Sequence, residues 1–136
     1  MQNYKKQFAE FLVKSDALQF GEFTLKSGRV SPYFFNSSKF NTGPMIEQLG
    51  QFYASAIEHY APSCTVVFGP AYKGIPLCVA VATALSKKMN RNIGYFFNRK
   101  EIKTHGDRGT LVGHFPQSHD MLVMVDDVFT DGNTKI

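Results

Sequence analysis

The sequence has little cysteine and no long apolar run. Cys64 and Cys78 are its only cysteines, each lies in an apolar segment, and no Cys-x-x-Cys pair occurs. Buried free thiols in a reducing cytosol explain this pattern better than a disulfide or a metal site. Charged residues interrupt the N-terminal segment 1–18, unlike a signal peptide, and no stretch is long enough to span a bilayer. These absences predict a soluble cytoplasmic protein that has no membrane partner.

Internal repeats and low-complexity tracts are also absent from the sequence. The length of 136 residues suits one domain, 1–136, and the hydrophobic content of 43% suffices for a core. The formal net charge is +4, which favours anionic partners such as phosphorylated metabolites or nucleic acid. The alternative is that this charge only keeps a small domain soluble.

Apolar periodicity predicts an alternation of helices and strands. Apolar residues recur at helical spacing over 4–13, 46–60 and 75–85, and Thr42 or Asn41 is placed to cap the second of these helices. Two short strands flank a basic turn at 26–29. Continuous apolar runs at 64–68, 93–97 and 121–125 suit strands buried between helices in a parallel sheet. The order of these elements predicts an α/β fold.

In an open α/β sheet, ligands bind beyond the carboxyl ends of the strands, and the first such end is followed by the glycine-bearing turn 69–74. Backbone amides at the start of the next helix can hold a phosphate, and Lys73 adds a positive charge. The turn matches neither a Walker A loop nor a dinucleotide fingerprint. Taken alone, it is explained equally well as an ordinary tight turn.

The second strand end leads into a long, polar, glycine-bearing stretch, 98–119. A loop of that length in a compact domain is usually functional or disordered. Its cations could close over an anionic substrate as a lid, although a solvated surface loop is the simpler interpretation of most charge clusters. The residues that give it this character include Arg99, Lys100, Lys103, His105, Asp107 and Arg108.

The third strand end carries two adjacent acids, Asp126 and Asp127, followed by a loop of small and hydroxyl residues at 130–134. Adjacent acids at a strand end can accept hydrogen bonds from the hydroxyls of a ribose. Small hydroxyl residues with a glycine at a helix start form a phosphate cradle. The acids and the cradle together predict a ribose-phosphate site. A metal site built on the paired acids is the competing interpretation.

The segment 123–134 resembles the phosphoribosyl-pyrophosphate signature of the type I phosphoribosyltransferases: four apolar residues, two acids, two apolar residues and a small Thr/Ser/Gly loop. Four other segments resemble the orotate-specific, bacterial-type branch: FTLKSGR at 23–29, SPYFFN at 31–36, FGPAYKGIP at 68–76 and FNRKE at 97–101. The resemblance implies the type I phosphoribosyltransferase fold, a parallel sheet core flanked by helices with a small N-terminal hood. It also implies that the C-terminal strands, and with them an orotate-binding arginine, are missing from this chain.

The resemblance assigns roles motif by motif. The residues implied to contact orotate are Lys26, Phe34, Phe35 and Thr130. The residues implied to be catalytic, all in a mobile loop, are Arg99, Lys100, Lys103 and His105. The residues implied to bind phosphoribosyl pyrophosphate are Tyr72, Lys73, the same four loop residues, Asp126, Asp127, Val128, Phe129, Thr130, Asp131, Gly132, Asn133 and Thr134.

The implied reaction transfers ribose 5-phosphate from phosphoribosyl pyrophosphate to orotate, giving orotidine 5'-monophosphate and pyrophosphate, in the synthesis of UMP. Magnesium would be required and held mainly through the substrate, with no direct protein ligand. A homodimer is also implied, because the mobile loop of the family reaches the partner subunit's site. No nucleic acid is expected as a partner.

Three residues depart from the family pattern. Phe129 is bulkier than the usual aliphatic residue, Asp131 stands where a small neutral residue is typical, and Arg108 stands where glycine is common. Two alternatives remain beside the orotate enzyme. One is a non-enzymatic regulator that binds phosphoribosyl pyrophosphate, since one fold hosts several functions. The other is a phosphoribosyltransferase for a purine or for uracil.

Overall fold

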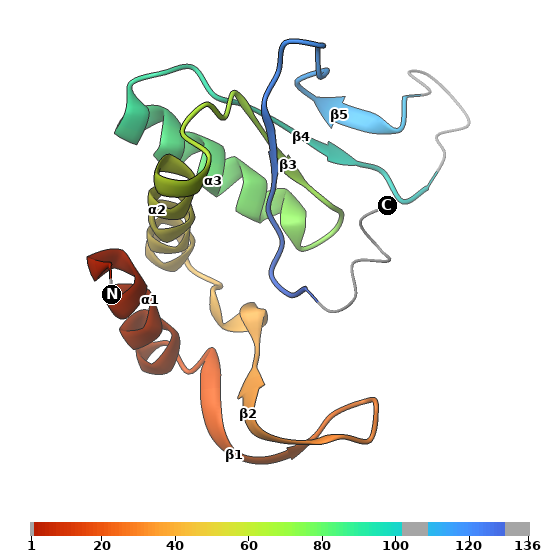
Figure 1. Ribbon diagram of the computed structural model, residues 1–136. Helices are drawn as coiled ribbons and strands as arrows, with labels where there is room; N and C mark the ends of the chain where they lie inside the picture. Colours follow the sequence, from red (N-terminus) through yellow and green to blue (C-terminus); the bar gives the residue numbers. More distant parts are fainter. Residues whose placement is uncertain (1, 102–108, 130–136) are drawn as a thin grey trace. The chain divides into compact units, whose positions relative to one another are not determined.

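The computed structural model describes residues 2–101 and 109–129, and the chain divides into two compact units, 1–45 and 46–136 (Figure 1). The first unit contains α1 (Asn3–Lys14), β1 (Leu18–Thr24), β2 (Val30–Phe35) and the short 3-10 helix η1 (Ser37–Lys39). The second unit contains the rest of the regular structure. The expectation of a single domain stays a prediction.

In the first unit, β1 and β2 form an antiparallel hairpin that confirms the predicted pair of strands about a basic turn. The turn is closed by the amide of Gly28, which donates to the carbonyl of Leu25 at 2.8 Å. Gly28 has a φ of 83°, a conformation that glycine adopts without the cost of a Cβ clash. The basic residues Lys26 and Arg29 are exposed on this turn.

Half-buried aromatic rings pack together in the first unit. The ring of Phe40 stacks on that of Phe11, with centroids 5.4 Å apart, and lies 6.3 Å from that of Phe35. Ala17, in the segment between α1 and β1, is fully buried. The buried hydroxyl of Ser31 donates to the carbonyl of Tyr33 at 2.7 Å, so this polar group is satisfied locally.

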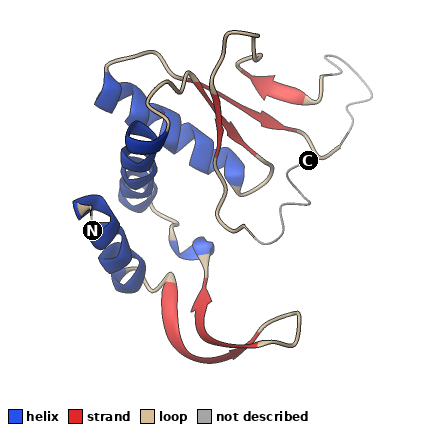
Figure 2. Ribbon diagram, in the orientation of Figure 1, coloured by secondary structure: helices blue, strands red, loops and turns tan. Residues whose placement is uncertain are grey.

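The second unit is an α/β layer. Its elements are α2 (Gly43–Tyr60), β3 (Val66–Gly69), α3 (Gly74–Met89), β4 (Gly94–Asn98), β5 (Leu111–Gly113) and β6 (Leu122–Met124). The strands lie in the order β5-β4-β3-β6, and β4, β3 and β6 are parallel (Figure 2). No helix among residues 2–101 and 109–129 is long and apolar enough to cross a membrane.

The two long helices of this unit follow from the sequence signals. Thr42 caps α2, as its hydroxyl oxygen accepts from the amide of Met45 at 3.4 Å. Helix α3 contacts β3 and β4 and buries one apolar face that includes Leu77, Val81 and Leu85. It ends at Asn90, whose left-handed φ of 49° is a common helix stop.

The stretch 98–119, expected to be a loop, contains the strand β5, which pairs antiparallel with β4. The sheet is therefore mixed: the expected parallel core, β4-β3-β6, is confirmed, and β5 adds one antiparallel strand at its edge. Burial between helices on both faces is wrong for part of the sheet. Val66 and Val67 of β3 are fully buried, but Tyr95 of β4 and Met124 of β6 are each 39% exposed.

A polar network joins the amino ends of β3 and β6. The hydroxyl of Thr65 donates to one carboxylate oxygen of Asp120 at 2.8 Å and accepts from the amide of Met121 at 2.9 Å. The other oxygen of Asp120 lies 2.9 Å from Nε2 of His114 and accepts from the amide of Gln117 at 2.8 Å. The His114 bond first, then the other two, hold the pKa of Asp120 well below its usual value.

Candidate functional site

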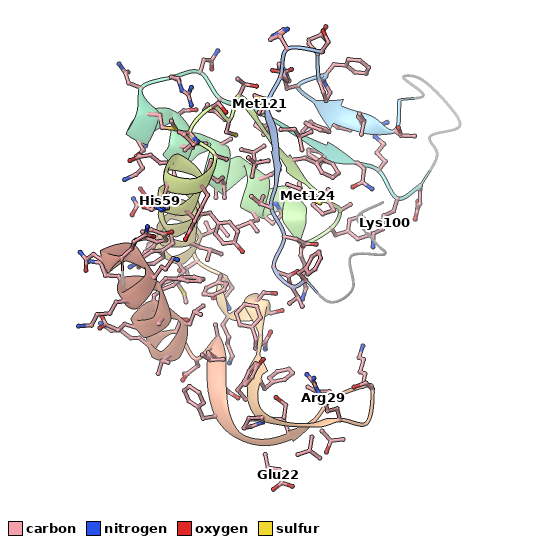
Figure 3. All side chains as sticks on the ribbon, viewed as in Figure 1. Glu22, Arg29, His59, Lys100, Met121 and Met124 are labelled. Atoms are coloured by element: carbon pink, nitrogen blue, oxygen red, sulfur yellow. The ribbon has the colours of Figure 1, made fainter. Side chains whose placement is uncertain are left out.

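The carboxyl ends of the three parallel strands bring three loops to one edge of the sheet. Gly69 at the end of β3 pairs with Phe97 of β4, and Phe68 pairs with Met124 of β6. The segments that follow are residues 70–73, 99–101 and 125–129. Figure 3 labels Lys100, just beyond β4, and Met124, the last residue of β6. This is the edge at which open α/β sheets bind ligands, as the sequence predicts.

The first and third loops meet through an ion pair. The Nζ atom of Lys73 lies 3.5 Å from Oδ2 of Asp127. The lysine side chain is 64% exposed, whereas that of Asp127 is only 20% exposed. A partly shielded carboxylate beside a cation that remains open to solvent can accept sugar hydroxyls while the cation faces phosphate oxygens.

The first and second loops also meet. The Nζ atom of Lys100 lies 5.1 Å from the centroid of the Tyr72 ring, within the range of a cation–π contact. The amide of Arg99 donates to the carbonyl of Thr110 at 2.7 Å. This bond holds the start of the predicted catalytic loop beside the residue that precedes β5. Tyr72, Lys73 and Lys100 are all exposed, so their polar groups are accessible to a ligand.

Close backbone packing shapes the loop after β3. A Cβ atom added to Gly69 would collide with the carbonyl group of Gly74 and lie 2.7 Å from Cβ of Cys78. A Cβ added to Gly74 would lie 2.8 Å from the carbonyl carbon of Gly69. Two glycines are therefore needed for α3 to begin directly against the end of β3. The amides of Gly74 and Ile75 at this start donate to the carbonyls of Pro70 and Tyr72 in the loop.

The two predicted ribose-binding acids are held by contacts that the sequence did not reveal. The phenol of Tyr53, on α2, donates to the backbone carbonyl of Asp126 at 2.8 Å. The amide of Asp127 donates to Oδ1 of Asp126 at 2.8 Å. Burial, and then the charges of Asp127 and Asp126, raise the pKa of Tyr53 to about 12, so its hydroxyl remains a donor.

A second unforeseen contact holds the loop after β3. The side-chain oxygen of Asn98, the last residue of β4, accepts from the amide of Ala71 at 2.8 Å. Tyr53 belongs to no recognisable motif, and the segment 97–101, which contains Asn98, does not show that the side chain of Asn98 reaches Ala71. The sequence reveals neither bond, because each joins residues far apart in the chain, 27 residues for Asn98 and 73 for Tyr53.

Three of the four residues expected to contact orotate, Lys26, Phe34 and Phe35, belong to the first unit. Lys26 lies exposed in the hairpin turn, and Phe34 is 40% exposed on β2. The ring of Phe34 lies 5.7 Å from that of Phe23, whereas Phe35 packs on Phe40. Successive residues of a strand point to opposite faces, so one flat ring cannot lie against both Phe34 and Phe35 on the same side.

Several predicted site residues lie outside the described residues, and their roles stay predictions. They are Lys103, His105, Thr130, Asp131, Gly132, Asn133 and Thr134, together with the departure at Arg108. Val128 and Phe129 are described, and both are exposed, Phe129 to 75%. The prediction of buried free thiols is confirmed for Cys64 and Cys78.

The edge is poor in metal ligands. Within 2–101 and 109–129, no group of three or more histidine, cysteine or acidic side chains is placed to hold a metal ion. Asp126 and Asp127 supply two carboxylates, and Lys73 already neutralises part of that charge. Magnesium is commonly bound by one or two carboxylates together with substrate phosphates, and the acid pair fits that mode.

A scan against family models gave no match. Curated relatives named orotate phosphoribosyltransferase are similar along almost the whole chain. That of Ruthia magnifica is 53% identical over 100% of this chain and 63% of its own length, and that of Nitrosococcus oceani is 52% identical over 98% and 60%. The chain therefore spans about three fifths of the length of these relatives.

Solved structures give the same result. A crystal structure of orotate phosphoribosyltransferase from Francisella tularensis has a TM-score of 0.80 and 43% identity, and the match covers 95% of this chain and 60% of that one. The fold is that of the type I phosphoribosyltransferases. Along almost its whole length, the chain is similar to orotate phosphoribosyltransferases.

Proposed function

We propose that the full-length protein transfers ribose 5-phosphate from phosphoribosyl pyrophosphate to orotate, releasing pyrophosphate, in the synthesis of UMP. One observation carries this proposal beyond the family resemblance. Lys73 and Asp127 lie 3.5 Å apart at the carboxyl edge of the sheet. A cation that can bind phosphate thus lies beside an acid that can bind a sugar. A pyrophosphorylated ribose needs both groups side by side.

On the donor side, Asp126 and Asp127 would accept hydrogen bonds from the ribose hydroxyls. Lys73, on the loop that leads into α3, would bind the pyrophosphate group. Segment 130–134 would hold the 5'-phosphate. On donor binding, the ion pair between Lys73 and Asp127 would weaken. Lys73 would then contact phosphate oxygens, and Asp127 would accept hydrogen bonds from ribose hydroxyls.

The bond between ribose and pyrophosphate breaks with an oxocarbenium-like transition state, as in glycoside cleavage. Negative charge then grows on the departing pyrophosphate. Lys100 contacts the ring of Tyr72, the residue that precedes Lys73. Arg99, Lys103 and His105 would join these two lysines on loop closure. Cations that meet this growing charge stabilise the transition state more than the bound donor, which raises the rate.

On the acceptor side, orotate is a flat anion that needs an aromatic surface and a cation. Lys26 would supply the cation. Of the two candidate phenylalanines, we assign the ring contact to Phe34, because Phe34 is exposed and Phe35 is packed against Phe40. Phe35 would then support the strand and not the base.

Magnesium is part of the proposal, held mainly through the pyrophosphate group and supplying further positive charge there. Its support is chemical: the acid pair and the cations leave phosphate oxygens as the dominant ligands. A homodimer with shared loop residues and a cytoplasmic location also remain proposals. They derive from the family resemblance.

Turnover of the full-length protein tests the function. We expect the orotate absorbance to fall only when phosphoribosyl pyrophosphate and magnesium are both present. Uracil and hypoxanthine, supplied in place of orotate, serve as controls for base specificity. Consumption of either control base without consumption of orotate would refute the assignment. Donor binding without any turnover, accompanied by salt-dependent DNA binding, would instead favour the regulator.

A further inference from the structure

Asn98 occupies a rigid position at the end of β4. Its backbone pairs with Leu111 of β5, and the following amide, that of Arg99, donates to the carbonyl of Thr110 at 2.7 Å. From this fixed point, the half-buried side chain reaches the loop after β3, where Oδ1 accepts from the amide of Ala71 at 2.8 Å. The bond fixes the orientation of the side-chain amide, because only its oxygen can accept from an N–H group.

Two backbone hydrogen bonds tie the loop 70–73 to the helix that it precedes. The carbonyls of Pro70 and Tyr72 accept from the first amides of α3, at 3.0 and 3.1 Å. The amide of Ala71 is tied instead to the neighbouring strand, so the side chain of Asn98 links the backbone of the loop to β4.

This link joins two parts of the proposed site. Tyr72 and Lys73 follow Ala71 directly, and Arg99 and Lys100 follow Asn98 directly. Lys100 also contacts the Tyr72 ring, at 5.1 Å, but that contact joins two exposed and flexible side chains. The hydrogen bond between Asn98 and Ala71 acts on the backbone, so it sets the spacing of the two cationic segments before any ligand arrives.

We propose that Asn98 is a positioning residue that holds the loop 70–73 in its pyrophosphate-binding conformation and in register with Arg99 and Lys100. Asn98 does not itself contact the substrate. The inference rests on the proposed function in one respect, namely that Lys73 and its loop bind pyrophosphate. It adds a role for Asn98, which lies in the segment 97–101 but to which the resemblance assigns no function.

The test is the binding of inorganic pyrophosphate with magnesium to the full-length protein, measured by calorimetry, in wild type and in Asn98→Leu. Leucine has a similar size and no acceptor. We expect the dissociation constant for pyrophosphate to rise about tenfold, the effect of leaving one partly buried amide without its acceptor. The KM for the donor should rise with it, while the KM for orotate stays at the wild-type value.

Ser86→Ala is the matched control. The hydroxyl oxygen of Ser86 accepts from the amide of Ile93 at 3.1 Å, which is the same kind of bond beside the opposite end of β4. We expect this variant to lose stability and to keep its affinity for pyrophosphate. If Asn98→Leu does not fold, Asn98→Ser takes its place, because the shorter hydroxyl cannot span the distance to Ala71.

Unchanged pyrophosphate affinity in the Asn98 variant overturns the proposal. Equal losses in the Asn98 and Ser86 variants also overturn it, since they indicate a general loss of structure. The proposal is also overturned if the wild-type protein binds no pyrophosphate. Pyrophosphate binding without consumption of orotate refutes the proposed function instead, and it leaves the role of Asn98 to be decided by the affinities.

Discussion

The phenol of Tyr53 donates a hydrogen bond of 2.8 Å to the backbone carbonyl of Asp126, across 73 residues of sequence. The ladder between β3 and β6 extends one bond beyond the strand, where the amide of Val125 donates to the carbonyl of Phe68 at 2.9 Å. Asp126 is the next residue. Strand pairing stops there, and the carbonyl of Asp126 accepts its hydrogen bond from Tyr53 instead. Helix α2 thereby fixes the start of the acid loop.

Tyr53→Phe should lower the free energy of unfolding by about 1 kcal/mol at neutral pH, because one hydrogen bond is lost. The pKa of Tyr53 is about 12 in the folded state against an ordinary value of 10.0, so the unfolded chain releases this proton first. Stability is thus complete below pH 10 and falls as the pH rises toward 12, by at most about 3 kcal/mol. Urea unfolding of both proteins at pH 9 to 12 measures this, and parallel pH profiles would contradict it.

Asp126→Asn and Asp127→Asn should each weaken donor binding, because an ionised acid accepts ribose hydroxyls in stronger, charge-assisted bonds. The expected loss is roughly 1.5–3 kcal/mol for each variant. Asp127→Asn also removes the partner of Lys73 at 3.5 Å, but this exposed lysine makes the effect on folding small. The measurements are donor affinity and thermal midpoint. Wild-type affinity in both variants would show that the acids only end a strand.

Gly69→Ala should disrupt the loop after β3, because the new Cβ would collide with the carbonyl group of Gly74, which is backbone and cannot rotate away. Overpacking of this kind typically costs about 1–3 kcal/mol of stability, and donor binding should fall with it. Gly43→Ala is the control, since its Cβ would meet nothing within 4 Å. Thermal melting and pyrophosphate titration compare the two. A fully stable, fully binding Gly69→Ala protein would show that the close approach is not required.

The two thiols should resist alkylation in the native protein. Burial raises the pKa of Cys64 and raises that of Cys78 to about 11, from an ordinary value of 9.0. For Cys78 this leaves about a hundredfold less thiolate at pH 8, and the thiolate is the reactive form. Mass spectrometry after iodoacetamide treatment should find neither residue modified before denaturation and both modified after it. Rapid native labelling of Cys78 would disprove its burial.

The helices and most strands could be predicted because each carries a local signal. The cap at Thr42 and the lysines at the end of α3 mark their helices within a few residues. Strand β5 carries no such signal, since Leu111–Gly113 is only three residues long and ends in a glycine with a φ of 107°. It exists because β4 offers an edge with which to pair, a relation that local periodicity does not contain.

The candidate site shows the same division. Acids, glycines and lysines at strand ends are visible in the sequence, since chemistry of that kind depends on residue type and local spacing. The bonds of Tyr53 and Asn98 were not predicted, although Asn98 lies in the segment 97–101, because each side chain binds a backbone group far along the chain. The choice between Phe34 and Phe35 likewise required knowing which of them packs on Phe40.

The network of Thr65, His114 and Asp120 lies at the amino ends of the strands, and the acids and cations lie at the carboxyl ends. Loop substitutions beyond the carboxyl ends leave these amino-end bonds in place. In the second unit, the loops at the carboxyl ends can therefore be varied while the amino-end network stays intact. Altered ligand preference should be sought by varying the residues that flank Lys73 and Lys100, while Asp120 and its partners are kept constant.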